Sequence, residues 1–559
     1  MRRLPKCLLA SLSRPLLHHR VPLPLPPLLH PLPPRFRPRF LPFSTETLTP
    51  DISPDAAPTA KPGPLVYLEE AEVHELAGNH QLVLDLALKA LVPLQESHGG
   101  WSLHVARALR LAGAAAARTG RVSDGLESLG AAAEIVDYLR GARRGDRKVA
   151  TVGAAVYEHL ARAKTAAGRS WDAVGDLRRA LELKVGFLDA GSAELGDAYR
   201  DAAEAYAGVL DFDKALTLCL KALEIAEGRS GEDSAEVAKV RRILAVIYIG
   251  LGRNEEALEQ IELARTVYER LGLDVELSQV EIDGANVHTL LGRSEEAVNY
   301  LKKVMQRSDK ESEERALAYV TMAKILSFQD RFGDSKQCIE IARGIIDSKD
   351  SMSAGRVAEI YAEISMLYEL MTEFETSLTL MKKTLVLLQG ASEMQHIAGS
   401  ISARMGWLLL LTKRVDEAVP YLESAVDKLK NCFGPKHFGL GFAYKHLGQA
   451  YLEMDQHQSA VKFLELAKDI IIATFGPTHE DSIDINQSLA NAYGLMGSYN
   501  VAMKFQEQVI DAYKSCDTSS SEELREAHRL LEQLRKKAQG SPAAVFPANT
   551  LPLLPENNN

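Results

Sequence analysis

The sequence predicts an all-α protein, built as a superhelical solenoid of antiparallel helix hairpins. Three observations lead to this fold class. The chain has 559 residues, more than one ordinary hydrophobic core holds. It is rich in Ala and Leu, which are strong helix formers, and only 6% aromatic. Its segments also repeat at a period of about 42 residues. The repetition favours one elongated array over several separate domains.

Residues 1–45 have the composition of an organellar transit peptide. They hold eight basic residues and eleven prolines but no acidic residue, and Met1–Leu17 supplies a basic amphipathic stretch. A disordered proline-rich tail that binds polyproline-recognising domains is the alternative, but the complete lack of acid argues against it. We expect import into the mitochondrion. The alternatives are the chloroplast, or the cytoplasm if the segment is not a transit peptide.

The remaining boundaries follow changes in composition. Residues 46–64 and 541–559 are rich in Pro and polar residues, so we expect a disordered linker and a disordered tail. Residues 65–515 are assigned to the repeat array. Residues 516–540 are assigned to a charged helix that caps the last apolar face and opens with a capping-box pattern. No run of 18 apolar residues occurs, so we expect no integral membrane span.

The repeat is clearest near the C-terminus. Residues 444–467 and 486–509 align without gaps at an offset of 42, and each follows a Phe-Gly-Pro-x-His turn. Each copy contains an octet with large residues at its first, fourth and eighth positions and a small one at the fifth. The octets begin at residues 67, 109, 157, 199, 241, 281, 319, 361, 402, 444 and 486. About eleven hairpins are therefore predicted.

The octet spacing has a packing explanation. Its large residues lie on one helical face, and the small residue lets a neighbouring helix approach closely. The small residues are Ala161, Ala203, Ala245, Ala285, Ala323, Ser365, Gly406, Gly448 and Ala490. An Ala or Ser opens the packing stripe of each second helix. A residue suited to left-handed backbone ends many first helices: Gly120, Gly168, Gly252, Gly292, Asp330, Thr372, Asp455 and Gly497.

These residues resemble the tetratricopeptide repeat family. The small, aromatic and Ala positions of its repeat are matched by Gly448-Tyr451-Ala460 and Ala490-Tyr493-Ala502. The period and the Phe-Gly-Pro-x-His turns are similar to the kinesin-light-chain-like subtype, especially its plant organellar relatives. The resemblance implies a right-handed superhelical solenoid with a concave groove that binds protein segments. In place of a kinesin light chain's N-terminal coiled coil, this chain has the transit-like segment and the linker.

The groove candidates are polar or aromatic residues at the second and sixth octet positions. Amide and basic side chains there can bind a peptide backbone or its carboxylate. The candidates are Arg162, Arg200, Arg242, Asn286, Trp407, Lys445, Gln449, Gln487 and Asn491. The resemblance implies that Asn491 holds an extended ligand. The alternative for each residue is a merely solvated surface position.

The sequence offers no catalytic, metal-binding or cofactor-binding motif. The five cysteines are widely scattered, and none forms a Cys-x-x-Cys pair. His437 and His479 occupy matching turns one repeat apart, a separation too large for shared ligation of one ion. Gly439-Leu440-Gly441 lacks the strand-to-helix context of a phosphate loop. We therefore expect no enzymatic activity and no cofactor.

The expected function is that of a non-enzymatic scaffold or adaptor, which binds partner peptides or helices in the groove within an organelle. An organellar RNA-associated factor is one alternative. Without residues 1–45 the chain has 57 basic and 75 acidic residues, which disfavours nucleic acid. A cytosolic cargo adapter of the kinesin-light-chain kind is the other alternative.

Overall fold

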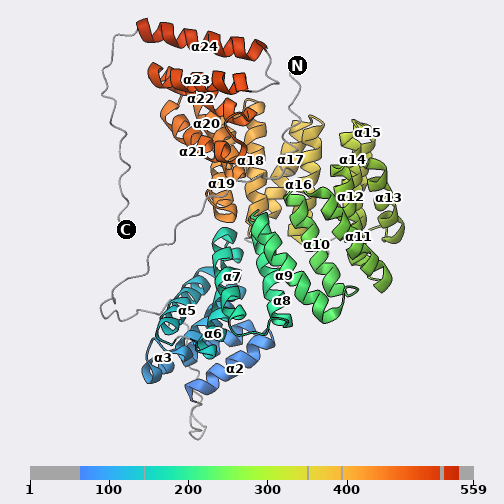
Figure 1. Ribbon diagram of the computed structural model, residues 1–559, viewed down its shortest axis with the longest axis vertical. Helices are drawn as coiled ribbons and strands as arrows, with labels where there is room; N and C mark the ends of the chain where they lie inside the picture. Colours follow the sequence, from blue (N-terminus) through green and yellow to red (C-terminus); the bar gives the residue numbers. More distant parts are fainter. Residues whose placement is uncertain (1–62, 144, 349–351, 392–393, 516–520, 541–559) are drawn as a thin grey trace. The chain divides into compact units, whose positions relative to one another are not determined.

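The structure is a computed structural model that describes residues 63–143, 145–348, 352–391, 394–515 and 521–540. The predicted transit peptide, nearly all of the predicted linker and the predicted C-terminal tail lie outside these residues. The described chain is all-α (Figure 1). It divides into two compact units. Unit 1 comprises its residues up to 408 together with 424–437, and unit 2 comprises 409–423 and its residues from 438 onward.

The described residues form 23 helices. Those that lie in unit 1 are α2 (Pro64–Leu76), α3 (His80–His98), α4 (Leu103–Arg118), α5 (Val122–Ala142), α6 (Arg147–Ala166), α7 (Ser170–Val185), α8 (Ala193–Gly208), α9 (Phe212–Ser230), α10 (Ala235–Gly250), α11 (Asn254–Leu271), α12 (Asp274–Leu290), α13 (Ser294–Arg307), α14 (Glu313–Phe328), α15 (Phe332–Asp347), α16 (Ala354–Leu370) and α17 (Phe374–Leu387). The helices α18 (Gln395–Leu411) and α19 (Val415–Phe433) contribute to both units. Those that lie in unit 2 are α20 (Phe438–Glu453), α21 (His457–Phe475), α22 (Glu480–Leu495), α23 (Tyr499–Ser515) and α24 (Ser521–Gly540).

The helices are arranged as consecutive hairpins. Each even-numbered helix packs against the odd-numbered helix that follows it, from α2–α3 to α16–α17 in unit 1, and as α20–α21 and α22–α23 in unit 2. The helices α18 and α19 form the remaining hairpin, since Gly399 of α18 lies directly against Lys428 and Leu429 of α19. All eleven predicted octets fall in even-numbered helices, which are the first helices of their hairpins. The predicted all-α array of eleven hairpins is therefore confirmed.

The small residues lie where the two helices of a hairpin meet. Ala203 in α8 and Ala215 in α9 are both fully buried, and so are Ala285 and Ala297 in the α12–α13 hairpin. Where a serine replaces the alanine of the second helix, its hydroxyl is satisfied. The Ser335 hydroxyl, for example, donates a hydrogen bond to the Ala323 carbonyl oxygen at 2.9 Å. The Ser377 hydroxyl likewise donates to the Ser365 carbonyl oxygen at 2.8 Å, so neither serine leaves its hydroxyl unpaired where the helices meet.

A residue with positive φ ends the first helix of every hairpin. All eight positions predicted from the sequence have this conformation, with φ between 57° and 86°. The remaining hairpins use Gly78, Leu210 and Lys413 in the same role. The sequence did not indicate Leu210 or Lys413, because neither residue type favours left-handed backbone. The packing of the hairpin thus imposes the positive φ of the turn residue, even where the residue type does not favour it.

The last hairpin is covered by α24. Ala527 and Leu531 of this helix are buried together with Ile483, Val509 and Ile510 of α22 and α23. The buried Gln506 side chain on α23 donates a hydrogen bond to the Ala527 carbonyl oxygen at 3.2 Å. The helix therefore shields the apolar face that α23 would otherwise expose, as the end of a repeat array requires.

Thr372 is the β-branched residue among the positive-φ turns, with φ of 63°. Left-handed backbone is costly for a β-branched side chain and nearly free for glycine. We therefore predict that Thr372→Gly raises the free energy of unfolding by about 0.5–1 kcal/mol. Urea unfolding followed by far-UV circular dichroism measures the change. The reverse exchange at a matching turn, Gly292→Thr, should lower the urea midpoint, and a lower midpoint for Thr372→Gly would contradict the explanation.

Gly448 lies at a close approach of α20 and α21. A methyl group on this residue would lie 2.6 Å from Cγ of Leu464 and 3.2 Å from the Ala460 carbonyl oxygen. We predict that Gly448→Ala lowers the free energy of unfolding by about 1–3 kcal/mol through overpacking. Gly130→Ala in α5 is the matched control, because no atom lies within 4 Å of the added methyl group there. The control should be neutral or stabilising, and equal losses in both variants would refute a steric cause.

Candidate functional site

The nine candidate residues all lie on first helices. Arg162 is on α6, Arg200 on α8, Arg242 on α10, Asn286 on α12 and Trp407 on α18. Lys445 and Gln449 are on α20, and Gln487 and Asn491 are on α22. Within each unit, we call the surface at these positions of the first helices the first-helix face. Its residues differ in what their side chains already contact.

Lys445 binds the next first helix. It is only 6% exposed, and its ammonium group lies 2.8 Å from Asp481 and 2.7 Å from Asp484 of α22. Burial alone would lower the pKa of Lys445, but the two carboxylates raise it above the ordinary value, so the lysine stays charged. The Gln449 amide also donates to Asp484, at 3.3 Å. Both candidates therefore hold α20 to α22.

Arg242, in unit 1, also contacts the next first helix. Its guanidinium donates to Asp283 at 2.6 Å and to Gln279 at 2.7 Å, and both acceptors lie on α12. Arg200 instead pairs with Asp197 and Asp201 of its own helix, at 2.6 and 2.9 Å. These two candidates are engaged within the protein, Arg242 between first helices and Arg200 along one helix.

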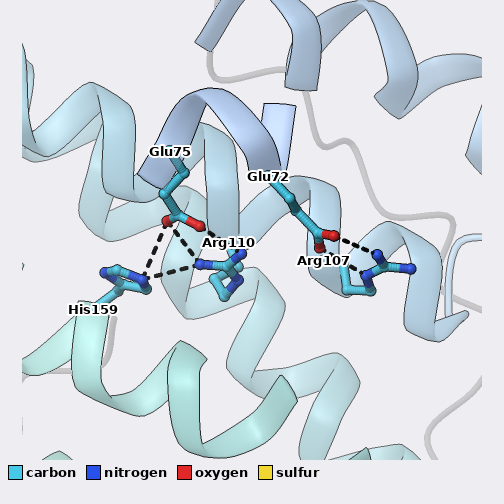
Figure 2. Close-up of polar contacts among 5 residues, drawn as sticks. All are labelled: Glu72, Glu75, Arg107, Arg110 and His159. Carbon is cyan, nitrogen blue, oxygen red and sulfur yellow. Dashed lines mark hydrogen bonds and ion pairs between the residues drawn. The ribbon is translucent and has the colours of Figure 1, made fainter. Parts of the chain in front are cut away.

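Four further ion pairs of this kind join successive first helices, and the sequence reasoning missed them. Arg107 pairs with Glu72 and Arg110 with Glu75, at 2.7 and 2.8 Å between α4 and α2 (Figure 2). Arg356 pairs with Glu313 at 2.5 Å between α16 and α14, and Arg404 with Glu369 at 2.7 Å between α18 and α16. These pairs could have been predicted from opposite charges that lie 35 to 43 residues apart, which is about one repeat.

His159 of α6 extends the first of these pairs to a third helix (Figure 2). Its Nε2 atom lies 3.0 Å from the Arg110 guanidinium and 3.4 Å from a Glu75 oxygen. Burial lowers the pKa of His159 to about 3, and the positive charges of Arg110, Arg162 and Arg118 contribute. The imidazole is therefore neutral near pH 7 and accepts a hydrogen bond from Arg110.

The remaining candidates differ in how far their side chains are exposed. Arg162 and Asn491 are exposed, while Asn286 and Trp407 are half-buried. The Asn286 amide donates to the Ile282 carbonyl oxygen of its own helix at 3.2 Å. The structure therefore leaves Arg162 and Asn491 as the candidates with the greatest exposure to solvent.

A cleft of about 360 Å³ lies beside Asn491 in unit 2. Its walls come from α22, α24 and one residue of α23: Gln487, Ser488, Ala490, Asn491, Gly494, Leu495, Gln506, Leu530, Gln533, Leu534 and Lys537. The Gln487 and Gln506 amides exchange two hydrogen bonds, at 2.9 and 3.1 Å, and so fix one wall. The cleft combines amide groups with leucine side chains, a lining suited to a peptide segment.

The two repeated histidines have structural roles. His437 stacks on Phe433 with ring centroids 4.5 Å apart, and His479 stacks on Phe475 at 4.8 Å. His479 also caps α22, accepting a hydrogen bond from the Asp481 backbone at 3.2 Å. Within the described residues, no cluster of three His, Cys, Asp or Glu side chains is placed to bind a metal. The described helices also include none long and apolar enough to cross a membrane.

Comparison with known proteins places this architecture in a family. A model of the tetratricopeptide repeat matches residues 194–270, 397–471 and 441–515. The Arabidopsis thaliana protein kinesin light chain-related 1 is 28% identical over 363 residues, which cover 64% of this chain and 59% of that protein. Kinesin light chain-related 2 of the same plant is 26% identical over 280 residues, covering 49% of this chain and 42% of that protein.

The alignments thus span less than two thirds of these curated relatives. Among solved structures, the yeast Tom70 aligns with 85% of this chain and 96% of its own at 14% identity, with a TM-score of 0.37. The resemblance inferred from the octets and turns is confirmed by the repeat matches and the plant relatives. This chain is a tetratricopeptide repeat protein related to the plant kinesin light chain-related proteins.

Proposed function

We propose that the chain is a non-enzymatic scaffold that binds an extended segment of a partner protein on its first-helix face. The observation that carries the proposal is the cleft at α22 and α24, where two predicted groove residues, Gln487 and Asn491, lie together. Tetratricopeptide repeats are protein-interaction repeats, and the cleft offers both kinds of contact that a peptide needs.

Each wall of the cleft has a separate part in this proposal. The exposed Asn491 amide can donate to and accept from a peptide backbone. Leu530 and Leu534 of α24, with Leu495 of α22, provide an apolar surface for one partner side chain. The cleft volume of about 360 Å³ is within the range of small ligand sites, so it holds a short part of a longer segment.

The ion pairs between first helices support the same proposal in another way. Arg242 and Lys445 hold neighbouring first helices at a fixed separation, so that a partner meets a surface already formed. A preorganised surface loses less entropy on binding than a flexible one. In this proposal these residues position the binding surface and do not contact the partner.

Asn491 gives the direct test. We predict that Asn491→Ala weakens partner binding about tenfold, because a hydrogen bond to the partner backbone is lost. Asn500→Ala is the matched control, since Asn500 is an exposed asparagine on α23 that does not line the cleft. Partner recovery with the tagged full chain is measured for both variants, with a photo-crosslinking residue at 491 or 500 to map the contact. Equal binding by both variants, or crosslinks to RNA at 491, would refute the proposal.

We further propose that the scaffold works inside an organelle, with the mitochondrion favoured. The support is the composition of residues 1–45, with eight basic residues and no acid. A C-terminal fluorescent fusion of the full chain is expected to enter the organelle and to be shortened at its N-terminus. A fusion in which these eight basic residues are changed to glutamine, at unchanged length, should remain in the cytosol. Diffuse cytosolic fluorescence from the unchanged chain would contradict the organellar proposal and leave the binding proposal standing.

A further inference from the structure

Two distant parts of unit 1 meet at the end of α19. Cys432, near the end of that helix, and Gly168, in the α6–α7 turn, are 264 residues apart in the sequence. The Cys432 thiol nevertheless donates a hydrogen bond to the Gly168 carbonyl oxygen at 3.3 Å. Stacking alone brings each hairpin of a solenoid against its neighbours only. A contact between the third and the ninth hairpin therefore lies outside this nearest-neighbour pattern.

Trp171 provides a second contact at the same place. A methyl group on Gly434, which follows α19, would lie 2.5 Å from Cδ2, 2.7 Å from Cε2 and 2.9 Å from Cε3 of the indole. The ring of Trp171 therefore packs directly on the glycine backbone, where no side chain fits. Gly434 also has a φ of 86°, so its turn and its contact both favour glycine.

The matching turn one repeat later lacks this contact. Gly476 has the same Phe-Gly-Pro sequence around it and a φ of 88°, yet a methyl group there would have no atom within 4 Å. The α6–α7 turn is unusual in the same way. Gly168 is buried, whereas the corresponding turn glycines Gly120 and Gly252 are at least partly exposed. Both sides of the contact thus depart from their own repeats.

We infer that Gly168, Trp171, Cys432 and Gly434 form a clasp that holds unit 1 in a closed form. The curvature of a solenoid is the sum of small rotations between successive hairpins. A contact between hairpins six positions apart constrains that sum, although each separate interface could vary. Release of the clasp is then the step by which unit 1 opens, with the hairpins themselves intact. This inference does not depend on the proposed function of the cleft in unit 2.

Cysteine reactivity tests the clasp directly. Cys432 is 2% exposed, and burial raises the pKa of its thiol to about 11. Trp171→Ala should accelerate alkylation of Cys432 by iodoacetamide in the full chain at least about fivefold, because thiol reactivity follows exposure. Cys219 is the internal reference, since it is fully buried inside the α8–α10 stack. Peptide mass spectrometry measures both rates in one sample. An unchanged rate at Cys432, or one that rises only in step with Cys219, overturns the clasp.

A second experiment compares Gly434 with Gly476, the glycine at the same place in the next Phe-Gly-Pro turn. With Trp101 and Trp407 replaced by Phe, Trp171 is the remaining tryptophan of the three in the chain. Gly434→Ala should then shift the Trp171 emission to longer wavelength and increase its quenching by acrylamide. Gly476→Ala introduces the same backbone strain without touching Trp171, so its spectrum should match that of the parent. Identical spectra for both variants, at equal helix content by circular dichroism, would show that Trp171 does not pack on Gly434.

Discussion

The closeness of two helix backbones at one small residue is the constraint on which this structure depends. Ala203 and Ala215 lie on the two helices of one hairpin, and both are fully buried. At Gly448 the two helices are so close that even an added methyl group would collide with Leu464. Because this contact between small residues recurs in each hairpin, the large octet residues face equivalent neighbours in each repeat. The array is therefore a repetition of one packing unit.

Electrostatic contacts act on the next level, between hairpins. Lys445 is almost fully enclosed and lies between two carboxylates of the following first helix. Removal of both carboxylates would leave the buried charge of Lys445 unpaired, which is far more costly than loss of an exposed ion pair. These contacts fix orientation more than they add stability. They also occupy several side chains that the pattern alone would offer to a partner.

Features that depend on nearby positions along the chain could be predicted from the sequence. The octets located every first helix, and the turn residues Asp330 and Thr372 were recognised because the period placed them at the ends of first helices. Leu210 and Lys413 were missed because their conformation is imposed by the hairpin and not by their own preference. The partners of Arg242 and Lys445 also escaped prediction, since they depend on the rotation between hairpins. Of the groove candidates, Gln487 and Asn491 line the cleft described in unit 2.

The contact between Trp171 and Gly434 has a consequence for how this array can change in length. Elsewhere in a repeat protein, loss or duplication of a whole hairpin preserves the contacts between neighbouring helices and is structurally tolerated. Between α7 and α19 the same event would move the indole away from its glycine by one repeat, although each hairpin remained intact. The contact between Trp171 and Gly434 therefore constrains the number of hairpins between α7 and α19.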